Sequence, residues 1–166
     1  MLGQKVLLNQ MPIAIKDSKI DISSEETTKE LAKDLTHYLK GGEIVYLYGE
    51  MGVGKTTFVR HLINQFQKNK KLHITEVTSP TFNLLNEYDI NDLVIKHYDL
   101  FRLKDESEIT NLDLFENNQN TITLIEWPQL ISKNKSIKTI DLIFSYENEL
   151  NNRSVSYTHL TLPTTD

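Results

Sequence analysis

The sequence predicts an α/β protein in which a mostly parallel central sheet is flanked by helices. Three observations support this fold class. Apolar, β-rich segments alternate with segments of helical periodicity, and a glycine-rich turn separates one such strand from the next helix. The length of 166 residues fits one domain with a sizeable core. We expect this domain to span residues 18–154, after an N-terminal extension of residues 1–17.

The first predicted elements are a short strand at residues 18–23 and an amphipathic helix that follows it. A capping-box pattern runs from Ser23 to Glu26 and marks the start of the helix. Apolar residues then recur at helical spacing as far as Leu39, and two consecutive glycines end the helix.

A strand buried on both faces is predicted next, because residues 43–48 (EIVYLY) form a continuous apolar and β-rich run. Beyond the glycine-rich turn, residues 58–66 carry the apolar face of a second helix, which ends near the sequence KNKK. Residues 73–82 have the composition of a strand that a proline interrupts.

The second half of the chain is predicted to contain a hairpin, a short helix and two further strands. Residues 83–101 form two strands around a polar turn at Asp89–Asp92. Residues 105–118 form the short helix, residues 121–127 a buried strand, and residues 137–147 a late strand.

The last residues differ abruptly in composition from the rest, with four threonines among the final nine. The run SVSYTHLTLPTTD resembles the translated sequencing-adapter runs found at the ends of draft-assembly proteins. We therefore expect residues 155–166 to be a non-native tail that cuts the closing strand short. The alternative is a genuine threonine-rich terminal strand.

The glycine-rich turn carries the most specific motif of the chain. Residues 49–56 read GEMGVGKT and match the pattern G-x4-G-K-[ST]. Phosphate oxygens need several converging backbone N–H groups, and glycine freely adopts the φ values of such a curled loop. The next helix points its positive N-terminal end at the same anion, Lys55 reaches the β and γ phosphates, and the Thr56 hydroxyl ligates Mg²⁺. We interpret this as the nucleotide-phosphate site of a single P-loop NTPase domain.

Two acids at the ends of predicted strands are candidates for the second half of this site. Glu126 ends a buried apolar run, and Asp99 follows the strand-like LVIKHY. A carboxylate at the C-terminal end of a strand in such a domain can reach Mg²⁺ or its water. Each acid taken alone is more typical of an exposed strand end, and the phosphate loop in the same domain reverses this preference for both. The five histidines show no metal-ligand spacing, and His97, beside Asp99, is interpreted as a packing residue.

Missing motifs narrow the class of phosphate-loop protein. A GTPase would need D-x-x-G, yet no glycine follows Gly54, and the guanine-reading N-K-x-D is missing as well. A small-molecule kinase usually clamps phosphates with several arginines, whereas this chain has three, and none is obviously placed as an arginine finger. The S-G-G-Q signature of transporter ATPases is also absent.

Composition favours a cytoplasmic protein that binds proteins more than nucleic acids. The net charge is −5, so a broad phosphate-backbone footprint is not expected. There is no cysteine, which excludes disulfides, thiolate catalysis and cysteine-ligated zinc. No apolar run approaches the ~18 residues of a membrane span, and the first residues lack the pattern of a secretory signal.

Four blocks in series resemble the TsaE (YjeE) family, the bacterial ATPases of tRNA threonylcarbamoyladenosine biosynthesis. They are LYGEMGVGKTTF, VTSPTFNLLNEY, HYDLFRL and LIEWPQ. Their order and spacing agree with the family from about residue 20 to residue 153. Each later block is weak alone, whereas the four together are highly specific.

The resemblance implies a role for each matching position. Lys55, Asp99 and Glu126 would be the catalytic residues, and Thr56, Asp99 and Glu126 would hold Mg²⁺. Ser79, Pro80 and Thr81 would form a switch-like loop facing the phosphates. The implied nucleotide-binding residues are Gly49, Glu50, Met51, Gly52, Val53, Gly54, Lys55, Thr56, Thr57, Thr81 and Trp127, with Glu25, Thr28 and Arg153 near the base.

The resemblance also implies a function and partners. ATP with Mg²⁺ would be hydrolysed to ADP and phosphate, slowly without partners, in support of threonylcarbamoyl modification of the adenosine next to the tRNA anticodon. The partners would be the threonylcarbamoyl transferase and its paralogous partner protein, and tRNA only indirectly. Two alternatives remain from the residues alone: a nucleotide-sensing switch without significant hydrolysis, and a small-molecule phosphotransferase.

Overall fold

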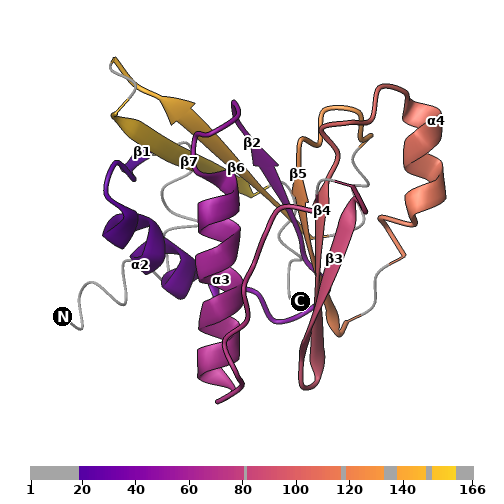
Figure 1. Ribbon diagram of the computed structural model, residues 1–166, viewed down its shortest axis with the longest axis horizontal. Coiled ribbons are helices and arrows are strands. Elements are labelled where there is room, and N and C mark those ends of the chain that lie inside the picture. The colour runs from indigo at the N-terminus through magenta and orange to yellow at the C-terminus, as the bar shows by residue number, and fades with distance from the viewer. Residues whose placement is uncertain (1–18, 81, 117–118, 133–137, 149–150, 160–166) are drawn as a thin grey trace, which may run out of the picture.

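The computed structural model describes residues 19–80, 82–116, 119–132, 138–148 and 151–159. Within them, helices and strands alternate along most of the chain, so the predicted α/β class is confirmed (Figure 1). The elements are β1 (Lys19–Asp21), α2 (Glu25–Leu35), β2 (Ile44–Tyr48), α3 (Lys55–Asn69), β3 (Leu85–Ile90), β4 (Leu93–Asp99), α4 (Glu106–Ile109), the 3₁₀ helix η1 (Thr110–Leu112), β5 (Thr121–Glu126), β6 (Thr139–Tyr146) and β7 (Arg153–His159).

The strands form one sheet in the order β1-β7-β6-β2-β5-β4-β3. The four central strands β6, β2, β5 and β4 pair in parallel, whereas β3, β7 and β1 pair antiparallel at the two sides. The sheet is therefore mixed rather than mostly parallel. The hairpin explains one side: only Asn91 and Asp92 join β3 to β4, and so short a connection requires antiparallel strands. Asn91 has the φ of +59° that suits such a turn.

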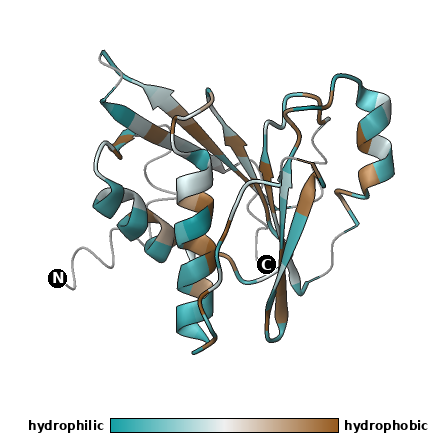
Figure 2. Ribbon diagram, in the orientation of Figure 1, coloured by the Kyte–Doolittle hydropathy of each residue, from teal (hydrophilic) through white to brown (hydrophobic). Residues whose placement is uncertain are grey.

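Each face of the sheet has its own core. Along β2, Val45 and Leu47 belong to the core beneath α2 and α3, whereas Ile44 and Tyr46 belong to the core on the other face. Figure 1 shows α2 and α3 together on one side of the sheet and α4 away from them, beyond β3 and β4. In Figure 2 the apolar residues of α3 face the strands and its polar residues face outward. None of the helices in the described ranges is long and apolar enough to cross a membrane.

The first helix begins and ends differently from the sequence prediction. Its N-cap is Ser24, whose hydroxyl accepts a hydrogen bond from the Glu26 backbone N–H at 3.2 Å, while Ser23 instead hydrogen-bonds to the backbone of Arg153. The helix ends at Leu35. Beyond it, the buried carboxylate of Glu43 accepts hydrogen bonds from the backbone N–H groups of Lys40 and Gly41, which stabilises a non-helical turn.

The strand predicted at residues 73–82 does not form in the described part of that range, residues 73–80 and 82. Residues 72–80 have no regular secondary structure. Gln67 of α3 holds this segment, because its side-chain amide donates to the Thr75 hydroxyl at 2.9 Å and its oxygen accepts from the Thr75 backbone N–H at 3.2 Å. Contact with the helix therefore replaces strand pairing.

β7 includes residues from the segment predicted to be a non-native tail. Val155 is fully buried, and its Cα pairs with those of Ile20 in β1 and Phe144 in β6. Residues 153–159 thus have a place in the sheet, which is the arrangement of the alternative terminal strand. Their origin stays a prediction, and residues 1–17 and 160–166 lie outside the described residues.

Candidate functional site

The candidate site lies where the C-terminal ends of β2, β4 and β5 meet. These strands are neighbours in the sheet and run in parallel. β2 leads directly into the glycine-rich loop and then into α3, while β4 ends at Asp99 and β5 at Glu126. In open α/β sheets, ligands bind in the crevice outside the carboxyl ends of the strands.

The glycine-rich loop adopts backbone conformations that residues other than glycine rarely adopt. The φ values are +146° at Gly49 and +118° at Gly54, which caps α3. A Cβ atom at Gly49 would also lie 2.8 Å from the carbonyl oxygen of Phe144. The loop therefore curls so that the N-terminus of α3, with its uncapped backbone N–H groups, lies at the site.

Lys55 is a buried cation at the first position of α3. Its side chain is enclosed although the described residues offer it no ion pair, since its Nζ donates to the backbone carbonyl oxygens of Gly49 and Glu50. The Nζ also lies 3.8 Å from the ring centroid of Trp127. Burial lowers the pKa of Lys55, whereas the nearby carboxylates of Glu126 and Asp99 oppose this shift. A phosphate anion would supply the missing counter-charge.

Glu126 lies at the centre of a hydrogen-bonded chain. Its side-chain oxygens accept from the Thr56 hydroxyl at 3.0 and 3.2 Å, and one of them lies 2.6 Å from Nε2 of His97. Glu126 is 2% exposed and His97 is fully buried. His97 is therefore packed in the interior, as predicted, and it additionally fixes the position of Glu126, which the sequence did not reveal.

Asp99 stands beside Glu126 in the sheet, because the two residues pair in the β4–β5 register. One carboxylate oxygen of Asp99 accepts from the Ser79 hydroxyl at 2.5 Å, and the other accepts from the Phe101 backbone N–H at 3.0 Å. Ser79 therefore lies at the site, as expected, whereas Thr81 lies outside the described residues.

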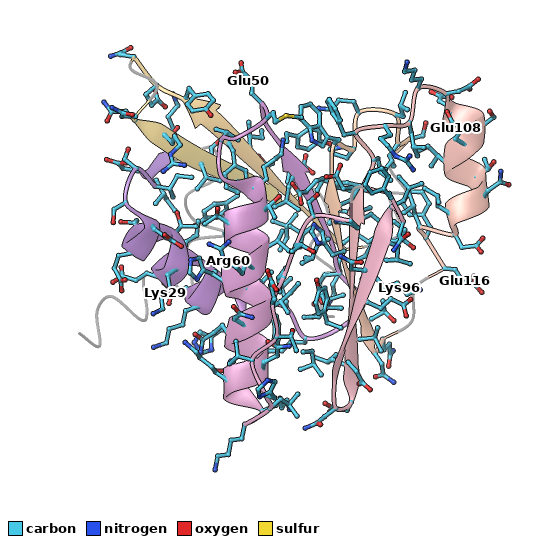
Figure 3. The ribbon with its side chains drawn as sticks, in the orientation of Figure 1. Lys29, Glu50, Arg60, Lys96, Glu108 and Glu116 are labelled. Atoms are coloured by element: carbon cyan, nitrogen blue, oxygen red, sulfur yellow. The ribbon has the colours of Figure 1, made fainter. Side chains whose placement is uncertain are left out.

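A cavity of about 320 Å³ joins these groups. It brings together most of the predicted site: Met51, Gly52, Gly54, Lys55, Thr56, Thr57, Ser79, Asp99, Glu126 and Trp127. Gly49, Glu50 and Val53 do not line it. Gly49 and Glu50 instead present carbonyl oxygens to Lys55, and Val53 is buried in the core. In Figure 3 the side chain of Glu50 points outward from the edge of the molecule.

The three residues predicted near the base, Glu25, Thr28 and Arg153, all lie outside the cavity lining, and Thr28 is buried. Glu25, at the start of α2, forms ion pairs with Arg60 at 3.0 Å and His61 at 2.9 Å, both on α3. Arg153 approaches the glycine-rich loop from β7, since its guanidinium lies 3.7 Å from where a Cβ of Gly54 would be. Arg153 also donates to the backbone carbonyl oxygen of Ser23 at 3.4 Å.

Two cavity residues were missed by the sequence prediction. Phe101 contacts Trp127, with ring centroids 4.8 Å apart. Arg102 also lines the cavity, and its guanidinium donates to the carbonyl oxygen of Phe82 at 2.9 Å. The sequence shows no obvious arginine finger, and the structure places Arg102 in the lining of the cavity that also holds both acids. The turn that directly follows Asp99 carries Arg102 back to the cavity, and the sequence signal was its distance of three residues from that acid.

The donor set fits a magnesium ion that is shared with a ligand. The Glu126 carboxylate accepts a hydrogen bond from the Thr56 hydroxyl, and the Asp99 carboxylate lines the same cavity. In the part of the chain that the structure describes, no group of three or more His, Cys, Asp or Glu side chains could hold a metal ion by itself. Mg²⁺ commonly binds through one or two carboxylates together with substrate phosphates and water.

Comparisons with known proteins agree on one family. A sequence model described as "Threonylcarbamoyl adenosine biosynthesis protein TsaE" matches residues 22–155. Proteins named tRNA threonylcarbamoyladenosine biosynthesis protein TsaE include one from Rickettsia conorii, 44% identical over 110 residues, which are 66% of this chain and 61% of that protein. The protein of that name from Bacillus subtilis is 31% identical over 145 residues, 87% of each chain. The match therefore spans about three fifths of the Rickettsia protein.

A solved structure shows the same fold. The crystal structure of Bacillus subtilis YdiB superposes with a TM-score of 0.67 at 23% sequence identity, covering 88% of this chain and 87% of that one. This similarity concerns the arrangement of helices and strands in the described residues.

Proposed function

Because the chain belongs to the TsaE family, we propose that it is a P-loop ATPase that supports threonylcarbamoyl modification of tRNA. The observation that carries this proposal is the placement of Lys55. A buried lysine whose described partners are neutral or aromatic opens onto a cavity beside two carboxylates. Such a cavity suits a polyphosphate bound together with a divalent cation.

Phosphate binding is assigned to the glycine-rich loop and the start of α3. Lys55 would exchange its two carbonyl partners for phosphate oxygens, which form stronger, charge-assisted hydrogen bonds. The backbone N–H groups at the start of α3 would bind the same anion. Trp127 forms an aromatic wall beside Lys55 and excludes water from one side of the cation.

Thr56, Asp99 and Glu126 are the residues that would hold Mg²⁺. When bound, this ion neutralises negative charge on the transferring phosphoryl group. Thr56 and Glu126 already share a hydrogen bond, and Ser79 holds Asp99. The oxygen atoms of this donor set are therefore positioned by the protein itself.

Glu126 is also the residue best placed to activate the attacking water. Its carboxylate would accept a proton from the water as the new P–O bond forms and the bond to the ADP oxygen breaks. His97 holds Glu126 by the 2.6 Å hydrogen bond, so the carboxylate is fixed before the reaction. The products are ADP and inorganic phosphate.

The biological partners are proposed from the family. We expect the chain to act in the cytoplasm on the threonylcarbamoyl transferase and its paralogous partner protein, and to meet tRNA only through that complex. The acidic net charge of −5 agrees with a protein-binding role.

Phosphate release should be slow for the isolated chain and faster when the transferase complex is added. Among the described residues, the cavity lining offers two cations, Lys55 and Arg102, so a further positive charge from the complex would add to the charge stabilisation of the reacting phosphoryl group. A well-placed arginine can contribute about 10³–10⁵ in rate. Measurement of phosphate release and modified tRNA in the same reaction, with and without the reconstituted complex, tests this expectation.

The same experiment separates the alternatives. Nucleotide binding without phosphate release, with or without the complex, would support a sensing switch. Release that requires a small-molecule acceptor would support a phosphotransferase. Hydrolysis that the complex does not change would contradict the proposed partner.

Trp127 should report nucleotide binding through its fluorescence. It is the sole tryptophan, it lines the cavity, and its ring lies 3.8 Å from Nζ of Lys55. Movement of this charge from the ring to a phosphate changes the environment of the indole. Titration with Mg·ATP should therefore shift the emission intensity or wavelength, and an unchanged spectrum at saturation would contradict binding in this cavity.

A further inference from the structure

Arg102 is a cavity cation for which the described residues supply no carboxylate partner. One N–H group of its guanidinium donates to the carbonyl oxygen of Phe82 at 2.9 Å, and the guanidinium lies 5.9 Å from the Phe82 ring centroid. No ion pair within the described ranges includes Arg102. An arginine side chain has five N–H donors in a rigid fork, so most of them remain available to a ligand.

The position of Arg102 is fixed by the turn that follows β4. The Phe101 backbone N–H donates to the Asp99 carboxylate at 3.0 Å, and Leu103 N–H donates to the carbonyl oxygen of Leu100 at 3.0 Å. Leu100 N–H in turn donates to the carbonyl oxygen of Glu126 at 3.1 Å. The turn is therefore hydrogen-bonded to Asp99 at the end of β4 and to Glu126 at the end of β5. Arg102 lines the cavity from this turn, whereas Lys55 lines it from the start of α3.

The charges around the cavity favour a ligand that carries several negative charges, even when a metal ion is bound as well. The lining holds two cations, Lys55 and Arg102, and two carboxylates, Asp99 and Glu126. One divalent cation would balance the two carboxylates. Lys55 and Arg102 are then left for the phosphate groups, and a triphosphate carries enough negative charge to bind both.

We propose that Arg102 binds the terminal phosphoryl group of the nucleotide and stabilises its charge during hydrolysis, as an arginine supplied by the same chain. This inference rests on the proposed ATPase function and names a further catalytic residue of that site. Arg102 stays protonated throughout. It uses its available N–H groups, or exchanges the neutral carbonyl of Phe82 for a charged phosphate oxygen, which is the stronger acceptor.

The competing explanation is that Arg102 only anchors the backbone at Phe82. Two substitutions distinguish the explanations. Arg102→Gln keeps an N–H donor for the Phe82 carbonyl and removes the charge, whereas Arg102→Lys keeps the charge and loses the fork. If Arg102 only anchors the backbone, its substitution should change the affinities for ADP and for the triphosphate equally. If Arg102 binds the terminal phosphate, its substitution should lower the affinity for the triphosphate alone.

Calorimetric titration of the full chain with Mg²⁺ and either ADP or a non-hydrolysable ATP analogue provides the test. For Arg102→Gln we expect the affinity for the analogue to fall by about tenfold or more, while the affinity for ADP changes by less than about threefold. Hydrolysis should fall at least about tenfold, and Arg102→Lys should be intermediate in both measurements. Lys104→Gln, which removes a neighbouring exposed cation, serves as the matched control.

Each outcome has a distinct consequence. Equal losses of affinity for both nucleotides, or no loss for either, would overturn the role of Arg102 while leaving the proposed ATPase intact. A wild-type chain that binds neither nucleotide would overturn the proposed function and this inference with it.

Discussion

Lys55→Ala is expected to lower the affinity for Mg·ATP by roughly tenfold to over a hundredfold. The substitution removes the cation that faces the cavity, and a hydrogen bond to a charged group contributes about 1.5–3 kcal/mol. The loss should be visible for ADP as well as ATP, because Lys55 lies at the loop that would hold the inner phosphates. Isothermal titration calorimetry with both nucleotides measures the effect.

Folding should survive this change, which makes the result interpretable. Lys55 forms no ion pair with the described residues, so its removal leaves no buried carboxylate that depended on it alone. Lys29→Ala is the matched control, since Lys29 is an exposed lysine that does not line the cavity, and Figure 3 shows it on the α2 side of the molecule. Near-wild-type affinity of the Lys55 variant, with the control unchanged, would contradict the assignment of the loop to phosphate.

The local elements of the fold could be predicted because each has a strong local signal. β2 is a continuous apolar run, β5 is a β-rich segment that is buried along its whole length, and α3 repeats its apolar residues at helical spacing directly after the glycine-rich loop. The failures involve long-range partners. Residues 73–82 look like a strand, yet Gln67 holds part of this segment against α3, and no local pattern reports that contact.

The sequence contained a signal for only part of the antiparallel pairing in the mixed sheet. The turn between β3 and β4 was recognised, and its shortness already implied an antiparallel pair at that side. The other antiparallel strands could not be foreseen, because β7 comes from residues whose composition suggested a non-native tail. Pairing of β7 with both β1 and β6 is a non-local property.

The candidate site was predictable where function requires specific residue types. Glycines in a curled loop, a lysine at a helix start and acids at strand ends each have a chemical reason visible in the sequence. His97 and Arg102 were missed as site residues for a different reason. Their roles depend on the register of β4 with β5 and on the turn after Asp99, which bring His97 to Glu126 and Arg102 to the cavity.

Glu126→Gln is expected to abolish most hydrolysis while leaving nucleotide binding largely intact. Glutamine has the size of glutamate and can still accept from the Thr56 hydroxyl, but it cannot take a proton from water. Loss of a general base typically lowers a rate by about 10²–10⁴. Phosphate release should fall by that factor in the presence of the transferase complex, and repeated rounds of tRNA modification should stop with it.

The matched control is Glu116→Gln, because Glu116 is an exposed glutamate that does not line the cavity and that Figure 3 shows at the α4 side of the molecule. It should hydrolyse ATP at the wild-type rate. Thermal unfolding of both variants checks that the buried contact of position 126 with His97 does not unfold the chain. If a folded Glu126→Gln variant binds Mg·ATP and still releases phosphate at the wild-type rate, another group activates the water, and the catalytic role of this carboxylate is wrong.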